Sequence, residues 1–399
     1  MSRSLLRRTL PLSALAAGLA LGQSALATGT PGAPVTRIAV TMTGKDGGTC
    51  VLDHDSAPAG PVTFVVTNRS APAISEMELL SDNRILGEKE NLAPGLPPVR
   101  FTVTLDGGEY QIYCPNAAQD TIAFSVSGHI AQRAQGTTAD LLEEGTKGYA
   151  HYVDGMVDAM VTGSKVLQAK IDAGDLAGAQ TEYAKVRPFY ERIESDVEGF
   201  TLPGSDPTDN AGNLDYLIDM RASNLDPAVG WHGFHAIERD LFQRGEITDD
   251  TKALAAELTT NATTLQHLSA ELRYRPEDLA NGAASLIEEV QSGKISGEEE
   301  AYAHIDLVDF AANIEGAQQA FAFLSPGMKQ IDPDLTQRVD ARFGAVKAML
   351  ETYRDPQSLG GYARYTASLR ASDARKLSHT IQALQEPLSQ IAEKVATAG

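Results

Sequence analysis

Residues 230–242 read GWHGFHAIERDLF, and their apolar side chains recur at helical spacing. On a helical wheel of about 100° per residue, Phe234 and Ile237 lie on one apolar face. Glu238 falls inside that face, and His235 lies just past its edge. A buried carboxylate is costly unless it is paired, hydrogen-bonded or bound to a metal. The stretch therefore predicts a helix with a binding site on its core side, and we expect a metal ion there.

The sequence around this stretch has the period of helices from about residue 137 to the C-terminus. Between residues 176 and 197 the apolar side chains recur at helical spacing, and Pro188 predicts a kink among them. Helices are predicted at residues 140–173, 176–197, 227–244, 249–272, 282–292, 298–324, 333–353 and 373–397. Together they predict an all-α helical bundle at residues 137–399.

The N-terminal part, residues 34–128, has the pattern of β-strands instead. Apolar and polar residues alternate in runs such as 62–67 and 101–105, and turns rich in glycine and proline separate the runs. Short alternating strands at this spacing predict an antiparallel β-sandwich. Residues 129–136 are predicted to link the sandwich to the bundle, so the fold class is a two-domain β + α protein.

The first 27 residues have the composition of an export signal. Three arginines precede an apolar stretch, and Ser24–Ala27 forms an A-x-A-like cleavage site. A membrane anchor would need about 20 continuous apolar residues, and this stretch is shorter and interrupted. We expect cleavage near Ala27 and an exported protein. Export would follow the general route or, because Arg7 and Arg8 are adjacent, the twin-arginine route.

The net charge excludes some partners. The formal charge is −20, and removal of the signal with its three arginines and no acids makes it −23. Such an acidic chain is expected to repel nucleic acid and anionic membrane surfaces and to attract cations. The chain has two cysteines, Cys50 and Cys114, and the default for a cysteine pair in an oxidising compartment is a disulfide.

A family resemblance is carried by several segments in order. Residues 233–238 read GFHAIE, which matches the G-x-H-x-x-E mark of the imelysin-like family. Other segments resemble EfeO-type periplasmic iron-uptake proteins. They are EMELL (76–80), EKENLAPG (88–95), YERIE (190–194), GAASLIEEV (282–290), KISGEEEAYAHIDLVDF (294–310) and ANIEGAQ (312–318). The resemblance covers nearly the whole chain after the signal.

The resemblance has implications for fold, function and partners. It implies a cupredoxin-like domain at residues 34–128, followed by an imelysin-like helical bundle at residues 137–399. It implies iron handling beside an iron permease and a haem peroxidase of the same uptake system. It does not imply a proven peptidase activity, although the imelysin-like family was grouped with peptidases.

Acidic residues and one histidine form the candidate site of the bundle. His235 and Glu238 are three residues apart, so one helix face presents both to a cation. Helical bundles build metal sites from such side chains on facing helices. The resemblance implies a metal site in a region that corresponds to His235, Glu238, Glu191, Glu194, Asp209 and Glu298. On a helix over 298–324, Glu298 would share a face with Asp309; Asp206 is the substitute for Asp209 in a loop that is hard to align.

One nitrogen and several oxygen ligands suit a hard or borderline cation. Ferrous or ferric iron fits this set, and zinc or copper could occupy it as well. A zinc-dependent metallopeptidase is one alternative, but HExxH, which holds zinc and supplies the base in many metalloproteases, is absent from the sequence. A protein that binds an acidic polysaccharide through a bridging cation is another, because some relatives bind such a polymer.

The sandwich carries a second candidate site. A blue-copper centre needs two histidines beside its cysteine, and the residues after Cys114 contain no histidine. The resemblance implies copper or ferric-iron ligands instead. These are Cys50, Cys114, Glu76 and Glu78, with Glu88 and Glu90 as further candidates. On a strand Glu76 and Glu78 face the same side, which fits shared coordination and also fits a solvated face. Disulfide and metal ligation both remain open for the cysteines.

These observations converge on an exported iron-binding component of an iron-uptake system, which passes iron to a membrane permease. Catalytic residues are not assigned.

Overall fold

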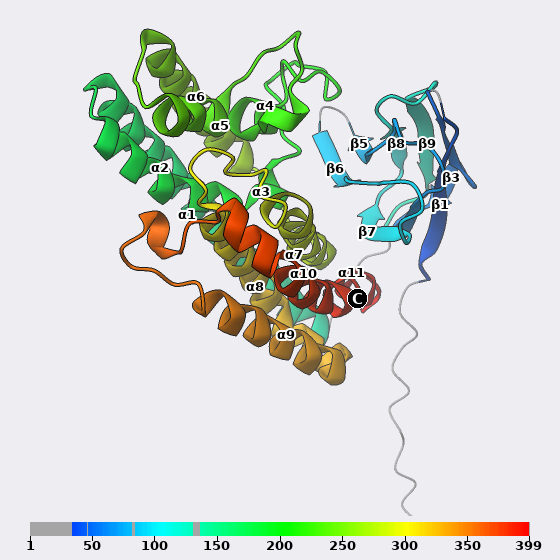
Figure 1. The fold of residues 1–399 in the computed structure, drawn as a ribbon. Helices are drawn as coiled ribbons and strands as arrows, with labels where there is room; N and C mark the ends of the chain where they lie inside the picture. Colours follow the sequence, from blue (N-terminus) through cyan, green and yellow to red (C-terminus); the bar gives the residue numbers. More distant parts are fainter. Residues whose placement is uncertain (1–33, 46, 82–83, 131–135, 399) are drawn as a thin grey trace, which may run out of the picture. The chain divides into compact units, whose positions relative to one another are not determined.

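The computed structural model describes residues 34–45, 47–81, 84–130 and 136–398, in which a β-sandwich precedes a helical region (Figure 1). The predicted signal segment lies outside these residues, as does most of the predicted linker. The strands are β1 Thr36–Thr43, β2 Thr49–Leu52, β3 Ser56–Pro58, β4 Gly60–Asn68, β5 Met77–Ser81, β6 Arg84–Lys89, β7 Val99–Leu105, β8 Gly108–Tyr113 and β9 Thr121–Ser127. The predicted order of strands before helices is confirmed.

The strands form two sheets, in the orders β2-β1-β4-β7 and β3-β9-β8-β5-β6. Two pairs are parallel, β1 with β4 and β3 with β9, so the prediction of a purely antiparallel sandwich was wrong. Between β1 and β4 the chain passes through β2 in the same sheet and β3 in the other sheet. It therefore returns beside β1 in the same direction. Alternating hydrophobicity identifies strands but does not select their partners.

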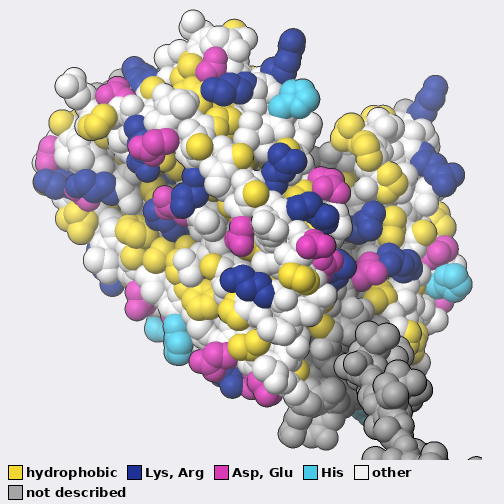
Figure 2. Space-filling model, turned by 90° about the horizontal axis from the view of Figure 1, so that it is seen from below, with side chains coloured by type: hydrophobic (Ala, Val, Ile, Leu, Met, Phe, Trp, Pro, Cys, Tyr) yellow, Lys and Arg dark blue, Asp and Glu magenta, His cyan; other side chains and the backbone are white. Residues whose placement is uncertain are grey.

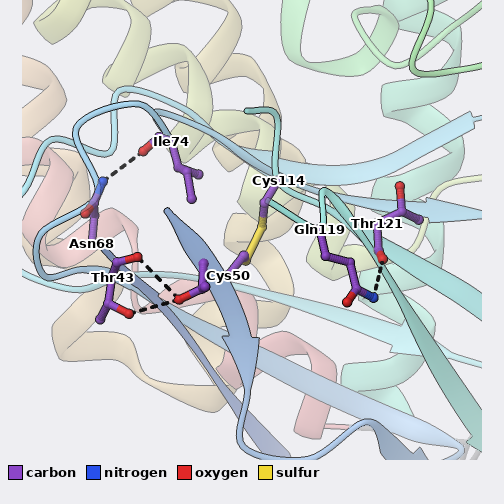
Figure 3. Close-up of a disulfide and its surroundings, with 8 residues drawn as sticks. Thr43, Cys50, Asn68, Ile74, Cys114, Gln119 and Thr121 are labelled. Atoms are coloured by element: carbon purple, nitrogen blue, oxygen red, sulfur yellow. Dashed lines mark hydrogen bonds between the residues drawn. A yellow bond between two sulfur atoms is a disulfide. The ribbon is translucent and has the colours of Figure 1, made fainter. Parts of the chain in front are cut away.

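The two sheets share one apolar core. Phe64 stacks on Phe101 of its own sheet and meets Phe124 of the other sheet edge-on. A disulfide between Cys50 on β2 and Cys114 just after β8 also joins the two sheets (Figure 3). The structure thus has the disulfide, one of the two alternatives left open by the sequence. In this bonded form the sulfurs are not thiolate ligands.

The disulfide should contribute strongly to stability, because it closes a loop of 64 residues in the unfolded chain. A loop of this size corresponds to about 4 kcal/mol in the chain-entropy model. We expect Cys50→Ala/Cys114→Ala to lower the unfolding free energy by about this amount. Thermal unfolding with and without a phosphine reductant tests this. Reductant should lower the midpoint of the wild type and leave that of the variant unchanged; equal midpoints for the oxidised wild type and the variant would contradict the prediction.

The helical region begins at α1. Its elements are α1 Thr137–Asp172, α2 Leu176–Glu191, α3 Glu194–Val197, α4 Leu214–Asp219, η1 Ala222–Asn224, α5 Gly233–Glu238, η2 Arg239–Arg244, α6 Asp249–Ser269, α7 Pro276–Glu289, η3 Val290–Lys294, α8 Asp306–Ile331, α9 Pro333–Glu351, η4 Leu359–Gly361, α10 Ala367–Leu388 and α11 Ile391–Thr397. One apolar core runs through them. Among the described residues, none of the helices combines the length and apolarity needed to span a membrane.

Two helix predictions were wrong in ways that affect the site. The helix predicted for 298–324 begins only at Asp306, and turns precede it. Glu298 is therefore not on a helix face and its side chain is exposed. The helix predicted for 227–244 begins at Gly233 and continues as the π-helix η2. Pro188 lies inside α2, which ends at Glu191.

Polar contacts join the sandwich to the helices. Lys89 of β6 donates a hydrogen bond of 2.6 Å to Glu288 of α7, and Lys89 is almost fully buried. Asn281 of α7 donates a bond of 2.6 Å to the carbonyl of Thr102 in β7. These contacts hold β6 and β7 against α7 and so position the acidic residues discussed below.

Part of the acidity of the chain is buried rather than exposed. On the face drawn in Figure 2, basic and acidic side chains are interspersed with apolar ones. Many carboxylates are instead buried in the helical region. They are Glu191, Glu194, Asp196, Asp219, Glu238, Asp240, Glu277, Glu289, Glu299, Glu300, Asp306 and Asp309.

Candidate metal centre

The G-x-H-x-x-E stretch forms α5, a helix of six buried residues. Its glycine is required by two features. Gly233 has φ of 74°, a left-handed conformation, and a Cβ atom there would lie 2.0 Å from the carbonyl oxygen of Ile218. The glycine therefore lets the start of α5 pack directly against α4, which carries Asp219.

Glu238 is held by the backbone. Its Oε1 accepts hydrogen bonds of 2.7 Å from the amides of Tyr302 and Ala303, and its Oε2 lies 3.3 Å from Nδ1 of His235. The buried carboxylate is thus satisfied by the turn before α8 and by the histidine. It fixes the position of that turn and orients the imidazole, and neither role needs a metal.

His235 points its other nitrogen at two carboxylates. Its Nε2 lies 3.6 Å from Oδ1 of Asp219 and 3.5 Å from Oε1 of Glu299, and it is buried without a hydrogen-bond partner among the described residues. Burial lowers the pKa of His235, but the nearby carboxylates of Asp219, Glu238 and Glu299 outweigh this effect and raise the pKa to about 10. The three side chains offer ligand atoms within 4.8 Å of one another.

Arg187 of α2 lies inside the same cluster and is fully buried. Its guanidinium contacts Glu191 and Asp219 closely, and reaches Glu299 at 2.9 Å, Glu300 at 3.3 Å and Asp309 at 3.4 Å. Burial opposes its charge, but these carboxylates raise the pKa of Arg187 well above its usual value. One arginine thus joins five carboxylates from four parts of the chain.

Lys294 at the end of η3 is a second fully buried cation. Its Nζ lies 3.2 Å from Glu191, 3.4 Å from Glu299, 3.6 Å from Glu194 and 3.8 Å from Glu289. Burial opposes the charge of this lysine too, and the surrounding carboxylates raise its pKa well above the usual value.

Carboxylates exceed cations in this cluster. Eight carboxyl groups contact His235, Arg187 and Lys294; they are Glu191, Glu194, Asp219, Glu238, Glu289, Glu299, Glu300 and Asp309. Burial and like charge raise the pKa of Glu194, Glu300 and Asp309 well above its usual value, and that of Asp219 to about 7. These shifts favour the protonated forms of the carboxyl groups, and a metal cation that binds here would replace those protons.

The structure brings together some of the predicted ligands. His235, Glu238, Glu191 and Glu194 all lie in the cluster. Asp209 is exposed in its loop, where its carboxylate accepts a hydrogen bond from the amide of Ala211, and its substitute Asp206 lies in the same loop away from the cluster. Sequence reasoning missed Asp219, Glu299, Glu300, Arg187 and Lys294.

The sandwich acids form a separate group. Glu78 of β5 lies opposite Glu88 of β6 in the strand register, and Glu76 precedes Glu78 by two residues. The three carboxylates offer oxygens within 4.8 Å of one another. Burial and the charge of Glu76 raise the pKa of Glu78 to about 9. Glu90 lines a cavity together with these three residues, but its side chain is more exposed than theirs.

Comparison with known proteins places the chain in a family. The family model described as imelysin (peptidase M75) matches residues 145–391. The iron uptake system component EfeO of Escherichia coli K12 is 34% identical over 363 residues, which cover 90% of this chain and 91% of that protein. The EfeO proteins of Shigella flexneri and of E. coli UTI89 are 34% and 33% identical over the same lengths. The chain belongs to the EfeO-type imelysin family. An aligned length of 363 residues exceeds the helical region, so the likeness to EfeO extends into the sandwich.

Within this EfeO-type chain, each marked residue of the family motif has a distinct structural role. Gly233 allows close packing, His235 faces the carboxylates, and Glu238 anchors the turn at Tyr302 and Ala303. Because Oε1 of Glu238 already accepts two amides, that oxygen is not free to act as the general base of a peptidase.

The glycine of the motif gives a direct test of this packing. We expect Gly233→Ala to lower the unfolding free energy by about 3–5 kcal/mol, because steric overlap adds to left-handed strain. Gly245→Ala is the matched control: Gly245 has φ of 66° but open space around it, so only about 1–2 kcal/mol of strain applies. Urea unfolding measures both, and equal losses would mean that the contact with Ile218 is unimportant.

Proposed function

We propose that this chain is an exported, periplasmic iron-binding component of an iron-uptake system, which receives iron and passes it to a membrane permease. The observation that carries the proposal is the buried group of His235, Asp219 and Glu299, whose ligand atoms converge while Nε2 of the histidine has no hydrogen-bond partner among the described residues. The relatives named as iron uptake components support the same reading.

The donor set indicates the kind of ion. Carboxylate oxygens with one imidazole nitrogen suit ferrous or ferric iron. Zinc and copper also bind imidazole nitrogen and would compete with iron for this site. A second set, Glu191, Glu299 and Asp309, shares Glu299 with the first. Buried oxygens without hydrogen-bond partners among the described residues occur in both Glu191 and Asp309. We place the iron at Glu299, where the two sets meet.

Arg187 and Lys294 serve as counter-ions in this proposal. They neutralise part of the carboxylate charge in the metal-free protein, and bound protons neutralise more. Because metal binding would displace those protons from Asp219 and His235, iron affinity should rise with pH through the region of the pKa of Asp219, about 7. Because Arg187 and Lys294 already neutralise part of the carboxylate charge, iron would be bound less tightly than by unpaired carboxylates. Its binding would therefore be reversible, as a carrier requires.

The sandwich would be a cupredoxin-like domain with its own cation site at Glu76, Glu78 and Glu88. Three oxygen donors favour ferric iron over copper. The sulfurs of Cys50 and Cys114 are bonded to each other, so they do not act as thiolate ligands. The iron permease and haem peroxidase of the uptake system are the proposed partners, and cleavage of the export signal near Ala27 belongs to the same proposal.

The decisive experiment is an anaerobic ferrous iron titration of the full mature chain, with ferric iron, zinc and copper in parallel. We compare the wild type with His235→Gln/Glu299→Gln and with the surface control His379→Ala/Glu246→Gln. Iron should bind the wild type and the control alike, and the site variant at least tenfold more weakly. Unchanged binding by a folded site variant would refute the assignment. Asp219→Asn provides a second variant if the first does not fold.

A further inference from the structure

A cavity of about 230 Å³ lies where the sandwich meets the helical region. Eight carboxylates line it, four from each part. They are Glu76, Glu78, Glu88 and Glu90 from the sandwich, and Glu194, Glu198, Asp215 and Glu289 from the helical region. We call this cavity the acidic chamber. Among its described lining residues, Arg221 is the one basic side chain.

An unpartnered atom points to a ligand in the chamber. Glu78 is only 6% exposed, and its buried Oε2 has no hydrogen-bond partner among the described residues. The strand register places Glu88 directly opposite it, so two carboxylates share one side of the ladder where like charges destabilise. A multivalent cation between them would relieve both the repulsion and the lack of a partner.

The acidic chamber shares residues with the buried cluster around His235. Glu194 and Glu289 line the chamber, and their carboxylates also lie 3.6 Å and 3.8 Å from Nζ of Lys294. Arg221 also connects the chamber to the cluster, because its Nη1 lies 3.3 Å from both Glu289 of the chamber and Glu299 of the cluster. Along these contacts between described residues, only the basic side chains of Arg221 and Lys294 separate the chamber carboxylates from Glu299.

We propose that the acidic chamber is a cation site built jointly by the sandwich and the helical region, and that it exchanges its ion with the buried cluster across Arg221 and Lys294. The inference rests on the proposed function and adds Glu198, Asp215 and Glu289 to the iron-binding residues. The carboxylates, together with the phenols of Tyr113 and Tyr216 in the lining, are oxygen donors. Hard cations, ferric iron in particular, are the matching class.

Terbium(III) is a suitable probe, because it is a hard trivalent ion whose luminescence is sensitised by nearby tyrosines. We would titrate terbium chloride into the full mature chain and excite tyrosine. The chamber variant is Glu198→Gln/Asp215→Asn. Both changes are isosteric, and an asparagine side chain can still accept the hydrogen bond that Tyr190 donates to Asp215. The control, Glu144→Gln/Glu246→Gln, removes two exposed charges.

We expect the chamber variant to bind terbium at least tenfold more weakly than the wild type and the control. His235→Gln/Glu299→Gln should keep chamber binding while it loses ferrous iron. If the chamber variant binds terbium as the wild type does, the chamber is not a cation site, whatever the iron titration shows. If the chamber variant loses terbium binding while His235→Gln/Glu299→Gln still binds iron, the proposed iron site at His235 is wrong and the proposal for the chamber stands. Glu78→Gln repeats the test from the sandwich side.

Discussion

Replacing Arg187 with methionine should be among the most destabilising single changes in this protein. The side chain is fully buried and contacts Glu191, Asp219, Glu299, Glu300 and Asp309. Removing one member of a buried ionic group leaves uncompensated charge and typically costs about 3–5 kcal/mol. We expect Arg187→Met to lower the unfolding free energy by that amount in metal-free protein at pH 8, measured by urea unfolding with a chelator present.

The loss should depend on pH in a defined direction. Without Arg187 the pKa of Asp219, already about 7 in the folded protein, rises further above its unfolded value. The folded state then binds more protons than the unfolded state, so stability falls as pH increases. The deficit of Arg187→Met should therefore be smaller at pH 5 than at pH 8. A deficit that does not change with pH would show that lost packing, rather than unpaired carboxylates, is responsible.

The matched control is Arg192→Met. Arg192 pairs with Glu315 at 2.7 Å, but both side chains are partly exposed. Surface ion pairs contribute about 0–1 kcal/mol, so this change should have a small effect. A comparable loss for both arginines would contradict the buried network.

The sequence predicted the helical site only in part, and the reason is geometric. His235 and Glu238 could be found because i, i+3 spacing places side chains on one helix face. Glu191 and Glu194 were indicated by the family resemblance, and in the structure Glu191 ends α2 whereas Glu194 begins α3. Glu299 and Glu300 could not be selected from the run 298–300, because periodicity reports nothing about a turn. The prediction chose Glu298, the exposed member of that run.

The buried cations were missed for a different reason. Lysine and arginine are rarely buried unless paired, so sequence alone favours a solvated position for both. A signal for Arg187 did exist, because Glu191 stands four residues after it, at ion-pair spacing. No such local signal existed for Lys294, whose partners come from α2, α3, α7 and the turn at Glu299.

The sandwich, too, could be predicted from the sequence only in part. Alternation located its strands. Glu76 and Glu78 lie in one group, although Glu76 precedes β5 and is not on the strand. The parallel pairs and the facing acids of the helical region follow from long-range packing, so a local pattern could not reveal them. The acidic chamber is therefore visible only once β5 and β6 are placed beside α4 and α7.

Replacing Lys294 with methionine should make the stability of the protein depend on metal. In metal-free protein the change leaves Glu191, Glu194 and Glu299 without their shared cation, and we expect a loss of about 3–5 kcal/mol. The same change removes a positive charge that opposes an incoming ion. Iron affinity should therefore increase, whereas Arg187→Met is expected to disturb the ligands themselves.

Thermal unfolding with and without ferrous iron, under anaerobic conditions, measures both effects. A ligand at 100 times its Kd stabilises the folded state by about 2.7 kcal/mol, so iron should restore much of the stability lost in Lys294→Met. The gain in midpoint on adding iron should exceed that of the wild type. The surface variant Lys185→Met, which removes an exposed partner of Glu182, should respond to iron as the wild type does. If iron stabilises Lys294→Met no more than it stabilises the wild type, the lysine is a structural counter-ion and does not compete with the metal.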